Sequence, residues 1–394
     1  MRRVVVVDGG ASGDHAETVE GVGAVAEAGL ARTEEVGVRE SVATVVPGTW
    51  EGGRRDEPAG ARMRPRLGFL GVGWIGRHRL EAIAASGLAE VVAVADPAGD
   101  AVAAALGVVP SAVRAVGLDE LLAAGLDGVV IATPSALHAE QAIAALEGGA
   151  AVFCQKPLGR TAAEVEAVVA AARRADRLLG VDLSYRHTAG LRAIRELVRG
   201  GELGEVYAVD LVFHNAYGPD KPWFYDPRLS GGGCVMDLGI HLVDLALWIL
   251  PEARVVGVES RLYAGGRALE GDAGGSGVGV AEDYAVAQLE LESGAVVRVA
   301  CSWRLPAGCD AVIEASFYGT RGGASFRNVG GSFYDFTAEV FQGTARRLLV
   351  GPPDAWGGRA AVAWVEGLAA GGRYDPEVEG VVEVARVLDR IYGR

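Results

Sequence analysis

Lysine is rare in this 394-residue chain, which contains 37 Lys and Arg residues together but only two lysines, Lys156 and Lys221. Lys156 stands in the stretch AAVFCQKPLG at 150–159. Arginine keeps its charge at any working pH, whereas lysine can release a proton and carries a compact ammonium group. Lys156 is therefore a candidate for chemistry that arginine cannot do, with a surface lysine on a loop as the alternative.

A second candidate pair lies in SGGGCVMDLGIHLVDLALWIL at 230–250, where Asp237 and His241 are four residues apart. The pattern predicts a helix start after three glycines, with both side chains on one face. Histidine titrates near ~6.5, so it can accept the hydroxyl proton when an alcohol loses hydride from carbon. The alternative is a helix-start aspartate followed by a core histidine.

A glycine fingerprint in LGFLGVGWIG indicates a dinucleotide site, because it directly follows an expected strand and opens an expected helix. Asp96 follows Gly76 by 20 residues, at the end of the expected strand EVVAVA, where its carboxylate can bind the adenosine ribose. A carboxylate there repels a 2′-phosphate, so we expect NAD rather than NADP; the alternative is a plain glycine turn. The expected cofactor loop comprises Gly71, Val72, Gly73, Trp74, Ile75 and Gly76.

The elements that must position these residues alternate from residue 66 onward. Short apolar runs at 66–71, 90–95, 128–133, 150–155 and 178–184 predict buried strands, with helices such as 136–148 and 161–177 between them. After about residue 185, longer alternating segments such as EVYAVDLVFH and DYAVAQLELE predict antiparallel strands. We therefore expect an α/β chain: a doubly wound parallel Rossmann sheet, then an α+β domain with a large open, mainly antiparallel sheet.

Three segments follow from this pattern. Residues 1–62 show no clear alternation and end in the polar, breaker-rich stretch 47–62. We interpret 1–62 as a mis-assigned start, with a loosely ordered extension or a small appended element as alternatives, and expect it to be dispensable. Residues 63–184 are the expected NAD-binding domain, and 185–394 the expected substrate-binding domain.

Composition limits the partners. The net charge of −14 disfavours nucleic acid and anionic membrane surfaces, because phosphate binding requires clustered Lys and Arg. The four cysteines lack a paired metal-binding spacing, and VVVV at 4–7 is too short to span a bilayer. We expect a cytoplasmic protein that needs no metal, binds a small molecule and forms a dimer or tetramer through the open sheet.

Several ordered motifs together resemble the glucose-fructose oxidoreductase and inositol dehydrogenase (Gfo/Idh/MocA) family. They are the glycine fingerprint, ATPSALH at 132–138, CQKPLG, YRH at 185–187, RELVRGGELGEV at 195–206 and GGGCVMDLGIHLVDL. The resemblance spans roughly residues 65–330, and the order of the motifs makes it more specific than any one of them.

The resemblance implies a place for Lys156 beside the nicotinamide, where its ammonium can donate to the reacting oxygen, stabilise a developing alkoxide and exchange a proton. Gln155 departs from the glutamate usual there, so the contact that this acid makes with the cofactor or the lysine becomes an amide contact. The resemblance further implies that Thr133, Pro134 and His138 line the nicotinamide side of the cleft. It places Arg186 near the cofactor or the substrate. Lys221 lies on an aromatic loop that can form a sugar-stacking rim, or is a solvated lysine.

The function that these observations favour is NAD-dependent interconversion of a secondary alcohol and a ketone on a sugar, cyclitol or (amino)glycoside. His241 is the expected proton carrier, Lys156 polarises the reacting oxygen, and Asp237 orients His241 or holds a substrate hydroxyl. The resemblance leaves the roles of His241 and Lys156 partly interchangeable. Two alternatives from other classes remain: a redox-neutral NAD-dependent glycoside hydrolase, and a non-catalytic regulator that senses a sugar or dinucleotide.

Overall fold

The computed structural model describes residues 64–269 and 279–394. The extension expected over residues 1–62, and the start expected at Met63, lie outside the described residues. The described residues form two β-sheets.

The first sheet of the described chain is parallel, in the order β3-β2-β1-β4-β5-β6. Its strands are β1 (Arg66–Leu70), β2 (Glu90–Ala95), β3 (Val113–Arg114), β4 (Gly128–Ile131), β5 (Ala151–Cys154) and β6 (Leu179–Val181). Every residue of β4 and β5 is buried, because apolar clusters cover both faces of the sheet. The predicted doubly wound Rossmann sheet is confirmed.

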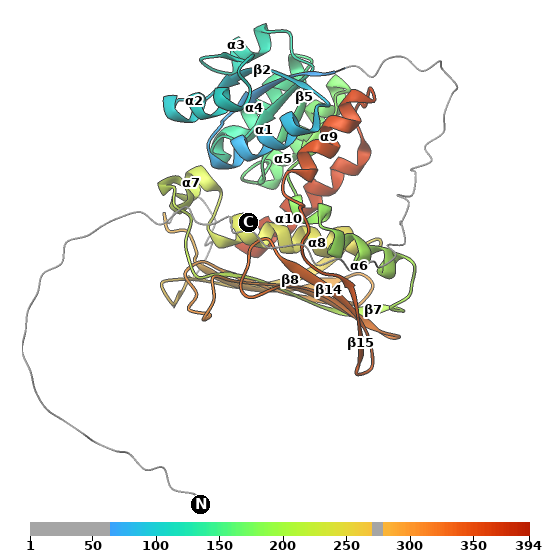
Figure 1. Cartoon of the computed structure of the whole chain (residues 1–394). Coiled ribbons are helices and arrows are strands. Elements are labelled where there is room, and N and C mark those ends of the chain that lie inside the picture. The colour runs from blue at the N-terminus through green and yellow to red at the C-terminus, as the bar shows by residue number, and fades with distance from the viewer. Residues whose placement is uncertain (1–63, 270–278) are drawn as a thin grey trace, which may run out of the picture. The chain divides into compact units, whose positions relative to one another are not determined.

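The helices of this half connect successive strands, as Figure 1 shows. They are α1 (Trp74–Ser86), α2 (Gly99–Val108), α3 (Leu118–Ala123), α4 (Ser135–Glu147) and α5 (Ala162–Ala175). At the start of α5 the Thr161 hydroxyl accepts the Glu164 N–H, which supplies a partner for one of the unpaired donors of the first turn.

The second sheet is mainly antiparallel and, within the described residues, has the order β15-β14-β13-β12-β7-β11-β10-β8-β9. Strands β7 and β11 pair in parallel; the other described neighbours run antiparallel. The bounds are β7 (Val206–Asn215), β8 (Val255–Ala264), β9 (Arg267–Ala268), β10 (Tyr284–Leu291), β11 (Val296–Ser302), β12 (Ala311–Gly319), β13 (Gly323–Asn328), β14 (Phe336–Gln342) and β15 (Ala345–Val350).

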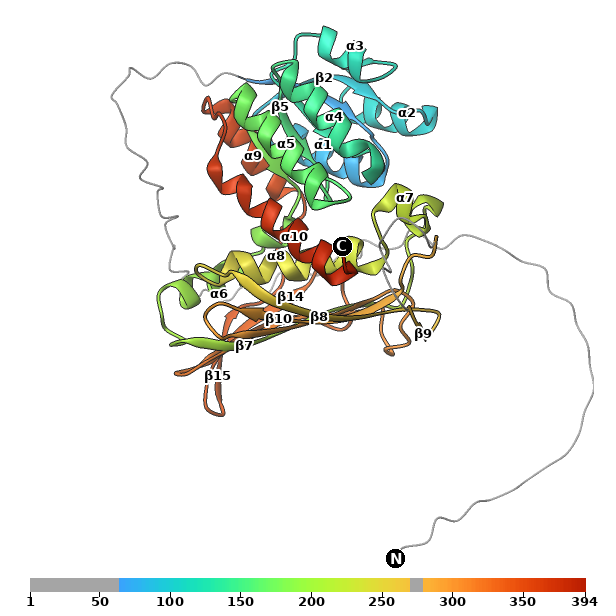
Figure 2. The ribbon, with the colours of Figure 1, turned by 180° about the vertical axis from the view of Figure 1, so that it is seen from behind.

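Burial alternates along the second sheet because helices cover one of its faces. In β10, Ala285, Ala287 and Leu289 are buried, whereas Val286 and Gln288 between them are exposed. The covering helices are α6 (Ala189–Arg199), α8 (Ile240–Ile249) and α10 (Gly380–Tyr392), which Figure 2 shows on the side of the sheet turned toward the parallel sheet. The predicted large, open, mainly antiparallel sheet is confirmed.

Helix α9 (Arg359–Ala369) returns from the second half of the chain to the first sheet. Its Trp364 ring packs against Phe153 of β5, with centroids 5.7 Å apart, and fills the space left by Gly128 and Gly180. The division at residues 184 and 185 stays a prediction, and α9 is an element beyond 185 that packs with the Rossmann strands.

We expect Trp364→Ala to lower the free energy of unfolding by about 3–5 kcal/mol, because a large buried side chain leaves a cavity against β5 and β6. Urea unfolding followed by circular dichroism measures the loss. Trp74→Ala is the matched control, since the Trp74 side chain is 66% exposed; it should change stability by less than about 0.5 kcal/mol. If Trp364→Ala lowers the free energy of unfolding no more than Trp74→Ala does, α9 does not support the parallel sheet.

Candidate active site

Lys156 and Asp237, which are 81 positions apart in the sequence, meet in the structure. The Lys156 Nζ donates hydrogen bonds to Asp237 Oδ1 at 2.7 Å and to the Asp237 carbonyl oxygen at 2.6 Å. Lys156 lies two positions after the end of β5. Its contact with Asp237 therefore joins the carboxyl end of the parallel sheet to the segment before α8. The two side chains are 18% and 17% exposed, so a small molecule can reach them.

The second carboxylate oxygen of Asp237 accepts a hydrogen bond from Trp303 Nε1 at 3.0 Å. Trp303 follows β11, so donors from both sheets fix the same carboxylate. Among the described residues no hydrogen bond joins Asp237 to His241, and the geometry therefore favours a role for Asp237 toward Lys156 or a substrate hydroxyl. Sequence reasoning missed Trp303, which belongs to no local motif.

The segment that carries Asp237 is a π-helical turn, Val235–Gly239, that leads into α8. Such a widened turn often occurs at functional sites. The three preceding glycines have separate steric reasons. Gly231 has φ +89°, and a Cβ built on Gly232 or Gly233 would lie 2.0 Å from Tyr392 Oη or the Glu282 carbonyl oxygen, respectively.

Glu282 holds this segment from within the protein. Its buried carboxylate accepts the N–H groups of Gly233 and Val235 at 2.8–2.9 Å and the Tyr392 hydroxyl at 2.8 Å. Burial raises the pKa of Glu282, while the hydrogen bonds act in the opposite direction. These contacts fix the start of the turn two residues before Asp237, and sequence reasoning missed them as well.

His241 lies one turn further along, on α8, and is buried among aromatic rings. Its ring meets the edge of Tyr185 at a centroid distance of 5.0 Å, and Phe213 lies at 6.4 Å. Burial lowers the pKa of His241 well below its usual value, and the positive charges of Lys156 and Arg79 lower it further. The neutral imidazole that results is the form that can accept a proton.

The cofactor loop has the geometry that a pyrophosphate requires. Gly71 has φ +87°, and a Cβ on Gly76 would lie 2.1 Å from the Gly71 carbonyl oxygen, so both positions need glycine for the turn and its packing. Gly73 instead faces open space, which lets a ligand approach the backbone at the start of α1. The residues present therefore fit a dinucleotide.

Asp96 follows β2 by one position and is held by backbone donors from both sides. Its Oδ2 accepts the Val72 N–H at 2.8 Å, and its Oδ1 accepts the Ala98 N–H at 2.9 Å. Trp74 is exposed at the first position of α1, with its ring stacked on His78 at 6.0 Å, and Ile75 is half-buried beside it. The structure thus brings Asp96 to the glycine loop, as the spacing predicts.

Thr133, Pro134 and His138 follow β4 toward and into α4. The Thr133 hydroxyl donates to Gln141 Oε1 at 2.6 Å. His138 is buried, with its ring nitrogens 2.7 Å from the Pro157 carbonyl oxygen and 2.6 Å from the Thr133 carbonyl oxygen. Burial lowers the pKa of His138, while the two carbonyl contacts act in the opposite direction. The ring thus connects Thr133 to the turn that follows Lys156.

The remaining predicted residues have partners of their own. Gln155 Nε2 donates to the buried Asp182 carboxylate. Arg186 pairs with Asp244, with its Nε 2.9 Å from Asp244 Oδ2. Lys221 is 64% exposed and lies 3.3 Å from Asp220, and no described contact places it at Asp237 or Lys156.

The aromatic loop after Lys221 does approach the site. Trp223 and Phe224 stack at 3.9 Å, and Tyr225 meets Trp303 at 5.5 Å between ring centroids. Tyr225, Asp283, Trp303 and Arg304 also border a hollow of about 380 Å³. The loop thus reaches the site through Trp303 rather than through Lys221.

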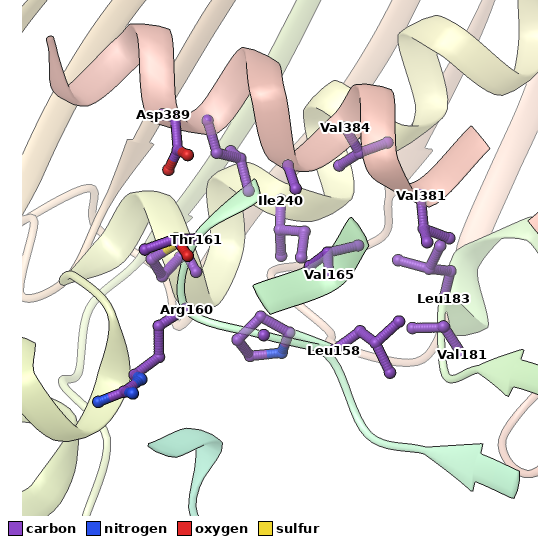
Figure 3. A pocket seen from close by; sticks show the side chains of 15 residues that line it. Leu158, Arg160, Thr161, Val165, Val181, Leu183, Ile240, Val381, Val384 and Asp389 are labelled. Atoms are coloured by element: carbon purple, nitrogen blue, oxygen red, sulfur yellow. The ribbon is translucent and has the colours of Figure 1, made fainter. Parts of the chain in front are cut away.

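An apolar cavity of about 20 Å³ is bordered by Leu158 and its neighbours in the turn that follows Lys156 (Figure 3). Leu158, Val165, Ile240 and Val384 line it, from the turn, α5, α8 and α10. Its largely aliphatic lining offers few partners to a polar ligand, so it is packing space between the two halves.

In the described residues, one helical stretch, Pro227–Ile249, is long and apolar enough to cross a membrane. Its most apolar window is 83% buried inside the protein, and the stretch includes Asp237 and His241. It is the core segment that carries the candidate site.

Two family sequence models match the chain in the order of its sheets. The model of the oxidoreductase family with an NAD-binding Rossmann fold matches residues 65–183, and the Gfo/Idh/MocA C-terminal domain matches residues 191–325. The chain belongs to the Gfo/Idh/MocA oxidoreductase family. Its first half is accordingly an NAD(P)-binding domain.

Relatives in the family differ in substrate. The inositol 2-dehydrogenase of Rhizobium meliloti is 31% identical over 266 residues, or 68% of this chain and 76% of that protein. Inositol 2-dehydrogenase 3 of Saccharopolyspora erythraea is 34% identical over 196 residues, 48% of this chain and 55% of that protein. The D-glucoside 3-dehydrogenase of Escherichia coli is 29% identical over 52% of this chain and 60% of that protein. The chain thus spans little more than half the length of the last two.

Solved structures share the fold. A levoglucosan dehydrogenase in complex with NADH superposes with a TM-score of 0.71 at 22% identity, over 84% of this chain and 96% of that chain. An oxidoreductase domain protein from Kribbella flavida gives a TM-score of 0.71 at 25% identity, with the same coverage.

We expect Gly233→Ala to destabilise the protein by about 1–3 kcal/mol or more, because the new methyl group would meet the Glu282 backbone and displace the turn before Asp237. Urea unfolding measures the change. Gly380→Ala is the matched control, since its Cβ would face open space at the start of α10; it should leave stability unchanged or raise it by up to about 1 kcal/mol. A fully stable Gly233→Ala protein would contradict this account of the glycines.

Proposed function

We propose that the protein is an NAD-dependent dehydrogenase that interconverts a secondary alcohol and a ketone on a sugar, cyclitol or (amino)glycoside. The observation that carries the proposal is the contact of Lys156 with Asp237, one helical turn before the buried His241. The relatives named for inositol and glucoside oxidation support this substrate class.

Lys156, His241 and Asp237 have different roles in the proposed oxidation of the alcohol. Bound NAD supplies the acceptor for the hydride that leaves the alcohol carbon. The Lys156 ammonium donates to the reacting oxygen and stabilises negative charge that develops on it. His241 accepts the hydroxyl proton, and Asp237 holds Lys156 in place and offers a carboxylate oxygen to a neighbouring substrate hydroxyl.

The aromatic loop after Lys221 suggests how the sugar is oriented in the site. Sugars present apolar ring faces and polar edges, so a site for them combines aromatic walls with a few polar groups. Tyr225, Trp303, Asp283 and Arg304 offer this combination around one hollow. We place substituents of the sugar there and its reacting hydroxyl at Lys156.

We expect tighter binding of NAD than of NADP by about tenfold or more, because the proposed ribose site lies beside the Asp96 carboxylate, which would repel a 2′-phosphate. Calorimetric titration of the purified protein with each cofactor measures the ratio. Asp96→Ala is expected to reduce the preference for NAD over NADP, because it removes the carboxylate that repels the 2′-phosphate. Equal affinities in the unsubstituted protein would refute the assignment of Asp96 to the ribose.

Lys156→Arg and His241→Ala are each expected to leave NAD affinity nearly intact and to lower kcat by on the order of a hundredfold or more, the usual scale for losing a proton-transfer or oxyanion-stabilising group. Steady-state rates with an active sugar measure the loss. Lys221→Arg is the matched control, because Lys221 is exposed and paired with Asp220. Near-normal turnover by Lys156→Arg would make Lys156 an electrostatic wall of the pocket only.

A screen of the purified protein with NAD across inositols, sugars, glycosides and aminoglycosides tests the function. The proposal predicts NADH in stoichiometric amount with a ketone product. Sugar release without net NADH would instead indicate the redox-neutral hydrolase, and binding of NAD and sugar with neither product would indicate the regulator. Either of these two outcomes would overturn the dehydrogenase proposal.

Charge and the second sheet suggest where the protein acts and how it assembles. With a net charge of −14, we propose a cytoplasmic protein that binds neither nucleic acid nor membranes. We further propose a homo-oligomer through the open face of the second sheet, where Arg298 and Asp210 form an exposed pair at 2.6 Å across β11 and β7.

A further inference from the structure

The residue before Lys156 is part of a buried polar cluster. Gln155 Nε2 donates to Asp182 Oδ2, and Arg79 Nε donates to the same oxygen at 2.5 Å. All three residues are buried, and the Asp182 side chain is fully so. They come from three elements: α1, the end of β5 and the end of β6.

The cluster depends on each of its donors. A buried carboxylate needs an opposite charge and further hydrogen bonds, because burial removes its hydration. Within the described residues, Asp182 Oδ1 has no hydrogen-bond partner. Arg79 and Gln155 are thus the side-chain donors on which this anion relies, and the loss of either leaves it poorly compensated.

This chemistry requires an amide at position 155. An ionised glutamate has acceptors only and would place a second carboxylate against Asp182, with one guanidinium for both. An apolar side chain of similar length would remove the donor without adding charge. The cluster therefore distinguishes an amide from an acid at this position.

The same cluster lies at one end of the segment that presents Lys156. The Gln155 N–H donates to the Ile131 carbonyl oxygen at 2.8 Å, and the Pro157 carbonyl oxygen lies 2.7 Å from the His138 ring. Lys156 stands between these two anchors and extends its side chain to Asp237. Rotation of the Gln155 side chain away from Asp182 would loosen the anchor adjacent to Lys156.

We propose that Asp182 and Gln155 are positioning residues for Lys156: the Arg79–Asp182–Gln155 cluster fixes the backbone from which Lys156 reaches Asp237 and the reacting oxygen. The catalytic part of this inference rests on the proposed dehydrogenase function. The placement of Lys156 is measurable without any substrate, so the two can fail separately.

Amine labelling tests the placement. Limited acetic anhydride at fixed pH, followed by peptide mass spectrometry, gives the labelling of Lys156 relative to Lys221, and these are the only lysines in the chain. Gln155→Glu and Gln155→Met are expected to raise the ratio by about threefold or more, because Lys156 leaves its contact with Asp237 more often. Gln288→Glu, the same change on the exposed face of β10, is the control and should leave the ratio unchanged.

An unchanged ratio in folded Gln155→Glu protein overturns the proposal. If that variant does not fold, as judged by circular dichroism, Gln155→Met decides the matter in the same way. Neither result depends on whether a sugar is oxidised, so a failure of the dehydrogenase proposal leaves this test readable.

Kinetics with an active sugar test the consequence. Gln155→Glu is expected to lower kcat by about tenfold or more with little change in the KM for NAD, because small displacements of a catalytic group are costly. The double variant Gln155→Glu, Asp182→Asn exchanges the two groups: position 155 then carries the single carboxylate near Arg79, and position 182 carries the amide that donates to it. The double variant should therefore be faster than Gln155→Glu alone, whereas losses that multiply would show a general packing role and overturn the proposal.

Discussion

A lysine at the end of one sheet must meet an aspartate that precedes a helix on another sheet, and most of the described structure serves this constraint. The Lys156 ammonium and the Asp237 carboxylate come from elements separated by 81 positions, yet their atoms approach within 2.7 Å. A partly exposed ion pair contributes little stability by itself, typically below about 1 kcal/mol. The surrounding elements therefore hold the pair together, rather than the pair holding the elements.

Buried polar contacts supply that support on each side. On the Asp237 side, the Glu282 carboxylate accepts hydrogen bonds from the Gly233 N–H and the Tyr392 hydroxyl, and Trp303 donates to the second carboxylate oxygen of Asp237. On the Lys156 side, His138 braces the following turn and Asp182 holds the preceding residue. Both halves thus present a polar group on a backbone that is fixed a few residues away, which is the condition for a preorganised site.

Elements that depend on a short stretch of neighbouring residues could be predicted from the sequence. Strands such as β4 and β5 are continuous apolar runs because both their faces are covered, and the glycine spacing with Asp96 needs only one strand, one turn and one helix. Lys156 was conspicuous because the chain is nearly free of lysine, and Asp237 and His241 because they follow three glycines. Whether these residues catalyse a reaction remains a prediction.

The contacts that complete the site had no such signal. Trp303, Glu282 and Asp182 are single residues at the ends of strands, and their partners lie 66, 49 and 27 positions away. Periodicity reports which face of an element is buried, but not which polar atoms meet across the fold. The same reason hid α9, whose apolar face is evident from its sequence while its place against β5 is not.

The double-mutant cycle of Lys156→Met and Asp237→Asn is the most direct test that the two residues act as one unit. Rates of NADH formation with an active sugar are compared for the two single variants and the double variant, with NAD saturating. Because groups that act together give strongly non-additive effects, the double variant should be little slower than the slower single variant. Losses that multiply, as for independent sites, would contradict the account.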